Sequence, residues 1–191
     1  MLRWIVLTGG PGSGKTVVSA ALVGQDPARY ALVPEAATQV YAALRTRWDR
    51  LDVAGRRKVQ RRIYRLQVEQ EARVARENPG KALLLDRGTI DGSAYWPDGP
   101  EDYWRDLGTT VEREIARYDA VIWLGCSAAI GRYDGDNSNF CRFEDAGQAV
   151  RNGELLRRLW EGHPRLRTVA ATRDVAEKVR RVREILETVV D

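Results

Sequence analysis

The stretch from Gly9 to Thr16, Gly-Gly-Pro-Gly-Ser-Gly-Lys-Thr, constrains this chain more than any other part of its sequence. It matches the Walker A pattern G-x-x-x-x-G-K-[ST] at every fixed position. An apolar run of strand type, residues 4–7, precedes it, and residues 16–22 have the composition of a buried helix. This order predicts a loop that wraps a phosphate group, because glycines let backbone N–H groups converge and a helix N-terminus attracts anions.

The residues of this loop are the candidate nucleotide-binding residues. Lys15 is expected to reach the β- and γ-phosphates of a nucleoside triphosphate, and the Thr16 hydroxyl to complete the coordination of Mg²⁺. The Asn-Lys-x-Asp motif of GTP-specific proteins does not occur in the sequence, so ATP is the expected nucleotide. The predicted set is Gly9, Gly10, Pro11, Gly12, Ser13, Gly14, Lys15 and Thr16.

Length and composition bound the remaining possibilities. A chain of 191 residues fits one domain, residues 1–191, and two cysteines with one histidine cannot assemble a zinc site. The first predicted strand begins too early to leave room for a signal peptide, and no apolar run has the ~20 residues of a membrane span. These features predict a cytoplasmic protein that does not engage membranes.

Short apolar runs alternate with helical segments along the chain, which is typical of a parallel sheet covered by helices. The predicted strands are residues 4–7, 30–33, 82–86, 120–124 and 166–169. The predicted helices are residues 36–77 in two pieces broken near 52–55, about 101–117, about 144–161, and a last helix capped by Asp174 with Glu177 at the capping-box position.

Two carboxylates follow predicted strands at the edge of the sheet where ligands bind in open α/β folds. Glu35 follows the second strand, although it could instead be a first-turn helix residue favoured by the helix dipole. Asp86 ends the third strand, where a carboxylate can hold Mg²⁺ directly or through water. Its neighbour Arg87 suits an anionic or hydroxyl-bearing acceptor better than the activation of water.

Three further segments are candidates for binding. Residues 88–103 are rich in aromatic side chains, among them Trp96, and form either a packed loop or a binding wall for a planar ligand. A lid is expected at about residues 125–145, where Arg132 and Arg142 flank a polar tip and could neutralise charge at the γ-phosphate. Arg173 lies in a segment that could hold an adenine ring.

Residues 45–76 contain eleven basic and four acidic residues. They form either a face that binds polyanions or a solvated helix face with i, i+4 pairs such as Arg65 and Glu69. No aromatic stacking pattern is interleaved with these arginines, which favours the solvated face.

These features together resemble the P-loop kinases of the AAA ATPase/kinase family typified by ribosylnicotinamide kinase domains, and more distantly the deoxynucleoside kinases. The features are the glycine-rich loop, Pro34-Glu35, Asp86-Arg87-Gly88-x-x-Asp91 and the arginine-bearing lid. The resemblance covers nearly the whole chain. It implies an α/β P-loop NTPase fold, a three-layer sandwich with a five-stranded parallel sheet, helices on both faces and a small lid.

The resemblance also implies a role for each site residue. Glu35 would take the proton of the acceptor hydroxyl, Asp86 would support the metal, and these two carboxylates could exchange roles. Arg87 would orient the acceptor, and Asp91 and Trp96 would contact it. The implied catalytic set is Lys15, Glu35, Asp86, Arg87, Arg132 and Arg142, with Arg132 also contacting the nucleotide.

Three functions remain open from the sequence. The first is an ATP- and Mg²⁺-dependent phosphotransferase acting on a hydroxyl group of a small, nucleoside-like acceptor. The second is a switch protein in which slow hydrolysis changes the affinity for a partner. The third is a polynucleotide kinase, whose arginines would follow a phosphate backbone and whose activity would depend steeply on salt.

Overall fold

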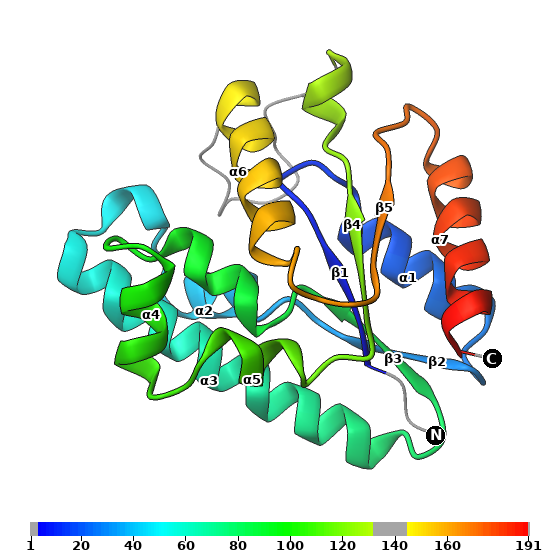
Figure 1. Cartoon of the computed structure of the whole chain (residues 1–191), viewed down its shortest axis with the longest axis horizontal. Coiled ribbons are helices and arrows are strands. Elements are labelled where there is room, and N and C mark those ends of the chain that lie inside the picture. The colour runs from blue at the N-terminus through cyan, green and yellow to red at the C-terminus, as the bar shows by residue number, and fades with distance from the viewer. Residues whose placement is uncertain (1–3, 132–144, 191) are drawn as a thin grey trace.

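The computed structural model describes residues 4–131 and 145–190, and its five strands form one sheet (Figure 1). The strand order is β2-β3-β1-β4-β5, and every pairing is parallel. The bounds agree closely with the predicted strands: β1 Trp4–Thr8, β2 Tyr30–Val33, β3 Ala82–Asp86, β4 Ala120–Leu124 and β5 Leu166–Val169. Of the predicted lid, residues 132–144 with Arg132 and Arg142 lie outside the described part of the chain.

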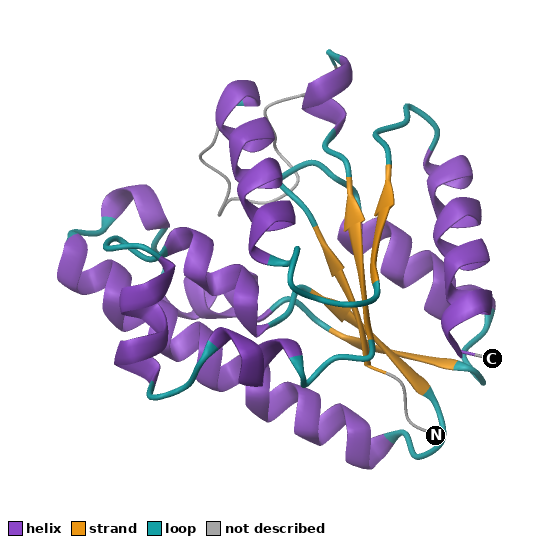
Figure 2. Cartoon of the chain, viewed as in Figure 1, coloured by secondary structure: helices purple, strands orange, loops and turns teal. Residues whose placement is uncertain are grey.

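Helices cover both faces of this sheet, as Figure 2 shows. α1 (Lys15–Gln25) and α7 (Val175–Val190) pack on one face, against strand side chains such as Ile5 and Leu7. The opposite face, which includes Val6, is covered by α3 and the helices near it. Because successive strand residues point to opposite faces, the continuous apolar runs fill two cores at once. The helices on that side are α3 Val53–Glu77, α4 Pro100–Leu107, α5 Val111–Ile115 and α6 Ala146–Leu159.

The break in the predicted helix 36–77 lies earlier than the sequence suggested. α2 (Ala36–Leu44) ends at Arg45, which has a left-handed backbone with φ of 50°, and a short 3₁₀ turn, Trp48–Arg50, follows. α3 then begins after Asp52, whose carboxylate accepts a hydrogen bond from the Gly55 N–H at 2.7 Å. Gly55 therefore belongs to the first turn of α3, and Asp52 is its N-cap.

The predicted helix 101–117 is two helices, α4 and α5. Gly108, with φ of 69°, ends α4, and the Thr110 hydroxyl caps α5 by accepting from the Arg113 N–H at 3.3 Å. The aromatic segment before α4 contains a 3₁₀ helix, Thr89–Tyr95, here called η2. The sequence carries local signals for the end of α4 and the start of α5, because glycine favours a helix C-terminus and threonine favours an N-cap.

The C-terminal helix begins after Asp174 as expected, but Glu177 does not form the expected capping box. Asp174 accepts a hydrogen bond from the Ala176 N–H at 2.8 Å, whereas Glu177 accepts one from the Thr172 hydroxyl rather than closing a capping box. Val175 is 53% exposed, and Lys178 is buried with 4% exposure. The inward face of α7 therefore includes a lysine.

Part of the basic segment is engaged in ion pairs. Arg57 binds Asp98 and Asp102, and Arg61 binds Asp106, so that α3 is tied to α4. Arg73 pairs with Glu77 at i, i+4, whereas the expected pair of Arg65 with Glu69 is not found among the described residues. These contacts are those of a solvated helix face for part of the segment. Within the part of the chain that the structure describes, no helix has the length and apolar character needed to cross a bilayer.

Candidate active site

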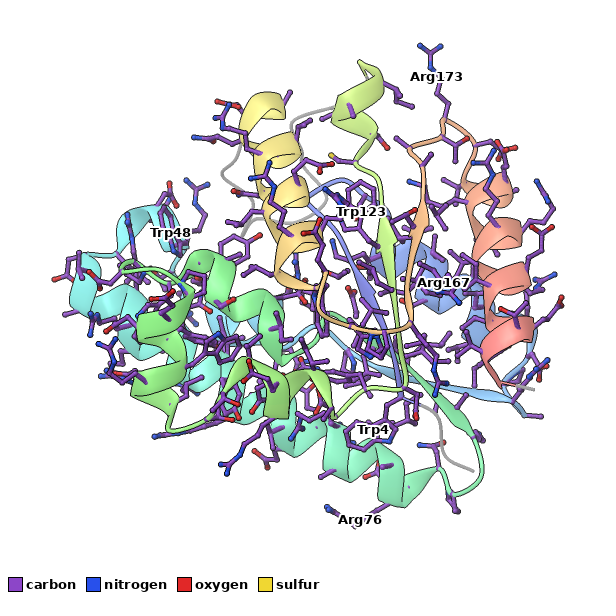
Figure 3. The ribbon with its side chains drawn as sticks, in the orientation of Figure 1. Trp4, Trp48, Arg76, Trp123, Arg167 and Arg173 are labelled. Atoms are coloured by element: carbon purple, nitrogen blue, oxygen red, sulfur yellow. The ribbon has the colours of Figure 1, made fainter. Side chains whose placement is uncertain are left out.

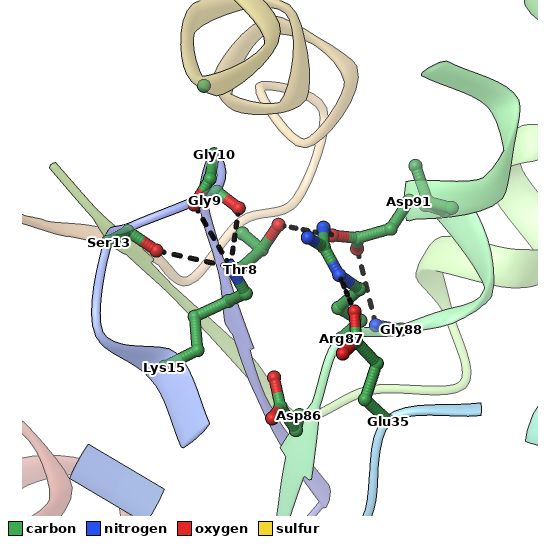
Figure 4. Close-up of polar contacts among 12 residues, drawn as sticks. Thr8, Gly9, Gly10, Ser13, Lys15, Glu35, Asp86, Arg87, Gly88 and Asp91 are labelled. Atoms are coloured by element: carbon green, nitrogen blue, oxygen red, sulfur yellow. Dashed lines mark hydrogen bonds and ion pairs between the residues drawn. The ribbon is translucent and has the colours of Figure 1, made fainter. Parts of the chain in front are cut away.

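The glycine-rich loop leaves β1 and curls around the side chain of Lys15. The Lys15 ammonium donates to the carbonyls of Gly9 (2.8 Å) and Gly10 (3.1 Å) and to the Ser13 hydroxyl (3.1 Å), as Figure 4 shows. Gly9 has φ of 138°, and a Cβ there would lie 2.3 Å from the Leu124 carbonyl oxygen, so only glycine fits. The loop is thereby folded for phosphate binding, with its lysine buried.

Asp86 lies beside this loop because β3 pairs with β1, placing Asp86 opposite Leu7. Its Oδ2 accepts a hydrogen bond from the Thr16 hydroxyl at 2.6 Å, and its Oδ1 is buried and has no hydrogen-bond partner among the described residues. An unpartnered buried carboxylate oxygen next to a hydroxyl suits Mg²⁺, which takes oxygen ligands and usually needs only one or two protein groups. Asp86 and Thr16, the two predicted metal ligands, are therefore brought together.

On the other side of Asp86, Arg87 joins two carboxylates. Its Nε donates to Glu35 at 2.6 Å, and its Nη1 to Asp91 at 3.2 Å. The second oxygen of Glu35 accepts from the Thr38 hydroxyl at 2.6 Å. Glu35 precedes α2 as its N-cap residue in extended conformation, so it lies at the end of β2 as predicted.

The backbone of Arg87 is left-handed, with φ of 78°, although it is not a glycine. Such a conformation costs about 1–3 kcal/mol and persists only where neighbours hold it. Here the Arg87 N–H donates to the Leu7 carbonyl at 3.1 Å, and the Gln67 amide donates to the Arg87 carbonyl at 3.2 Å. β1 and α3 therefore hold the guanidinium between Glu35 and Asp91.

Asp91 is fully engaged within the protein. Its carboxylate accepts from the Thr8 hydroxyl (2.6 Å), the Gly88 N–H (3.2 Å) and the Trp160 indole N–H (3.1 Å), besides Arg87. It lines the cavity described below, but these bonds give it a clear task within the structure, which is to fix Arg87. Thr8, Gln67 and Trp160 are supporting residues that sequence reasoning missed, since their contacts join distant elements.

The two carboxylates at the strand ends differ in charge environment. Burial disfavours ionisation of Glu35, but the charges of Arg87 and Lys15 outweigh it and lower the pKa of Glu35. Burial, together with the charge of Glu35, raises the pKa of Asp86. Glu35 is thus ionised at neutral pH, and Asp86 is the carboxylate that would gain most from a bound cation.

A cavity of about 160 Å³ connects the glycine-rich loop with α2, α3 and η2. Charged and polar side chains line it, namely Lys15, Thr16, Glu35, Arg87 and Asp91. Aromatic side chains line it as well, namely Tyr41, Trp48, Tyr64, Tyr95 and Tyr103. The Arg87 guanidinium lies 6.0 Å from the centre of the Tyr95 ring, so the two kinds of lining adjoin. The aromatic segment thus contributes Tyr95 and Tyr103 to the cavity wall, and other side chains to the packed core.

Two predicted site residues lie away from this cavity. Trp96 is buried behind the cavity wall. Its ring packs on the Tyr103 ring, with 5.2 Å between the ring centres, and its indole N–H donates to Asp102 at 2.8 Å. Arg173 is exposed on the loop after β5, and its side chain points outward from the fold (Figure 3). The structure therefore does not bring Trp96 into the cavity, nor Arg173 to the glycine-rich loop.

A comparison with protein-family models gives a match to the model described as AAA domain, over residues 4–178. The chain belongs to the AAA domain family. Among solved structures, the crystal structure of NadR protein in complex with NR is similar, with a TM-score of 0.69 and 16% sequence identity. The match covers 98% of this chain and 50% of the NadR chain. No curated protein matches.

The family match confirms the expected AAA ATPase/kinase grouping at the level of the AAA domain. At 16% identity the NadR comparison confirms the expected α/β P-loop fold, and this chain spans about half the length of the NadR chain.

Nucleotide binding to the AAA domain is expected to become pH dependent above pH 8. Burial, followed by the charge of Arg87, lowers the pKa of Lys15 to about 8. A bound phosphate favours the ammonium form and raises that pKa again, so binding takes up a proton where free Lys15 is neutral. We expect ADP affinity to fall by up to about tenfold per pH unit above pH 8.

Titration calorimetry in two buffers of different ionisation enthalpy measures this uptake. It should approach one proton at pH 9 and be absent at pH 6.5. If ADP bound equally well at pH 6.5 and pH 9, with no proton uptake at pH 9, Lys15 would not be the group that takes up a proton on binding.

Trp96→Phe is expected to destabilise the AAA domain without changing substrate affinity. The substitution leaves Asp102 without its indole donor, and the free energy of unfolding should fall by about 1–2 kcal/mol. The KM for the acceptor that a transfer assay identifies should stay unchanged, whereas Tyr95→Leu, at the cavity wall, should raise it. If only Trp96→Phe raised the KM for the acceptor, Trp96 would belong to the substrate site after all.

Proposed function

We propose that this chain transfers the γ-phosphoryl group of ATP, with Mg²⁺, to a hydroxyl group of a small, nucleoside-like acceptor. One observation carries the proposal: Glu35 and Arg87 share a cavity with the glycine-rich loop, and aromatic side chains make up much of the rest of its wall. A nucleotide-binding loop alone serves many activities. A lining that can bind another molecule in the same cavity as the loop suits transfer of the phosphoryl group to a bound acceptor.

The aromatic part of the cavity wall supports a planar acceptor with a polar edge. The aromatic rings suit stacking against a flat ligand ring. The buried Tyr103 hydroxyl has no hydrogen-bond partner among the residues that the structure describes, and the Gln60 amide lines the same cavity. Unpartnered buried polar groups are costly, so a ligand that engages them would recover that cost. The crystal structure of NadR protein holds NR, which agrees with a ligand in this fold.

The charged residues of the cavity each have a role in the proposed reaction. Lys15 and the loop N–H groups bind the β- and γ-phosphates. Thr16 and Asp86 would hold Mg²⁺, which would neutralise charge on the phosphates. Arg87 orients the acceptor beside Glu35. Glu35 is ionised and accepts the proton of the acceptor hydroxyl as that oxygen bonds to the γ-phosphorus, while the bond from the γ-phosphorus to the bridging oxygen breaks and ADP leaves. The low basicity of Glu35 suffices, because phosphoryl transfer depends chiefly on positioning and charge stabilisation.

Release of ADP with Mg·ATP tests the proposal, first alone and then against nucleosides, sugars, vitamins and short oligonucleotides. Stimulation by one small compound, with phosphate found on its hydroxyl, supports the kinase. A slow basal rate that no acceptor changes would overturn it and favour the switch protein. Activity on oligonucleotides that falls steeply with salt would favour a polynucleotide kinase.

A further inference from the structure

The carbonyl oxygens of the glycine-rich loop are all occupied. From Gly9 to Gly14, every one accepts a hydrogen bond from the protein. At the two ends of this run, the Lys15 ammonium donates to the carbonyls of Gly9 and Gly10, and an N–H of α1 donates to that of Gly14. The three central carbonyls, of Pro11, Gly12 and Ser13, are bound by donors from distant parts of the chain. These donors are the thiol of Cys126 (2.8 Å), the N–H of Ser127 (3.4 Å) and the ammonium of Lys178 (2.9 Å).

This arrangement fixes the direction of the loop N–H groups. In a planar trans peptide the C=O of one residue and the N–H of the next point in opposite directions. Lys178 binds the Ser13 carbonyl and therefore sets the direction of the Gly14 N–H. Gly14 precedes α1, whose first N–H groups have no partner within the helix and are free to bind an anion.

Lys178 is unusual in its own burial. It comes from α7 and is 4% exposed, and its ammonium also donates to the Gly125 carbonyl at 3.3 Å, just after β4. No carboxylate pairs with it among the described residues. A Cβ added to Gly14 would lie 3.9 Å from its Nζ. An ammonium buried without a counterion is costly, and the phosphate loop beside it is where an anion would offset that cost.

We propose that Lys178 is a positioning residue for the nucleotide phosphates: it holds the Ser13 carbonyl outward and ties it to the end of β4, so that the loop keeps its anion-binding form before nucleotide arrives. The inference rests on the nucleotide-binding part of the proposed function and is independent of the acceptor. The charge of Lys178 acts through the loop, whereas Lys15 contacts the phosphates.

The test compares Lys178→Met and Lys178→Gln with Lys81→Met, a matched lysine at the start of β3, far from the loop in sequence. We expect Lys178→Met to weaken ADP binding at least tenfold and to raise the KM for ATP more than it lowers kcat. Lys178→Gln should recover a good part of that affinity, because its amide can still donate to the Ser13 carbonyl. Lys81→Met should bind ADP like the wild type.

Hydrogen exchange without nucleotide supplies a second readout. The amides of residues 12–16 should exchange faster in Lys178→Met, with Lys178→Gln between it and the wild type. Wild-type ADP affinity in Lys178→Met would overturn the inference while leaving the kinase proposal intact. Equal loss in both variants, with a weaker salt dependence of ADP binding, would mean direct phosphate contact and would also overturn it. A wild type that does not bind ADP would instead refute the proposed function.

Discussion

Replacing Lys15 with methionine is expected to weaken binding of ADP and ATP by roughly 30-fold to several thousandfold. Removing one partner of a buried charged pair costs about 2–5 kcal/mol, and each 1.4 kcal/mol is a factor of about ten in affinity. Methionine keeps most of the alkyl chain and loses only the ammonium that the loop surrounds. Titration calorimetry with Mg·ADP measures the effect.

The same variant should fold at least as stably as the wild type without nucleotide. Burial lowers the pKa of Lys15, which means that the native state penalises its charge, and methionine removes that penalty. Thermal unfolding therefore separates a lost contact from a lost fold. Lys58→Met is the matched control on the exposed side of α3 and should change neither property. Wild-type affinity in Lys15→Met would count heavily against nucleotide binding at this loop.

Replacing Glu35 with glutamine is expected to lower the rate of phosphoryl transfer by about 10²–10⁴-fold while leaving ADP affinity within about threefold. Glutamine has the same shape, and its amide oxygen can still accept from Arg87 while its NH2 group donates to the Thr38 hydroxyl, so the arrangement of the site is kept. It can no longer take the proton of the acceptor hydroxyl. Single-turnover transfer at saturating acceptor measures the chemical step.

Two further variants sharpen the result for Glu35. Thr38→Val removes only one hydrogen bond to the carboxylate and should slow transfer far less than Glu35→Gln. Glu184→Gln, in an exposed pair with Arg180, is the matched control and should be neutral. Full turnover in Glu35→Gln would remove Glu35 as the base and leave Asp86 as the alternative.

The features that could be predicted from the sequence are those with local causes. The strands are continuous apolar runs, and the sheet edge at which they end follows from parallel pairing, so Glu35, Asp86 and Arg87 were expected beside the loop. The N-cap Asp52 and the helix-ending Gly108 are equally local signals, yet the break before α3 was predicted a few residues too late and the break at Gly108 was not predicted. Better use of capping signals would have found both.

The features that could not be predicted depend on contacts between distant elements. Trp96 and Tyr95 are adjacent and aromatic, and only the fold shows that one packs behind the cavity wall while the other lines it. Lys178 lies on an amphipathic helix where a lysine normally faces water. Its burial follows from the loop carbonyls and the end of β4, more than fifty residues away along the chain.

The position of α2 and α3 in the strand order separates two tasks within one cavity. α2 and α3 form a single excursion that leaves the sheet at the end of β2 and returns at the start of β3, and these two strands are neighbours. The excursion supplies many of the side chains that line the cavity, whereas β1, β4 and α7 support the glycine-rich loop. Under the proposed function, substitutions on the cavity side of this excursion therefore alter the choice of acceptor more than the binding of nucleotide. Gln67 is the exception, because its amide holds the Arg87 carbonyl.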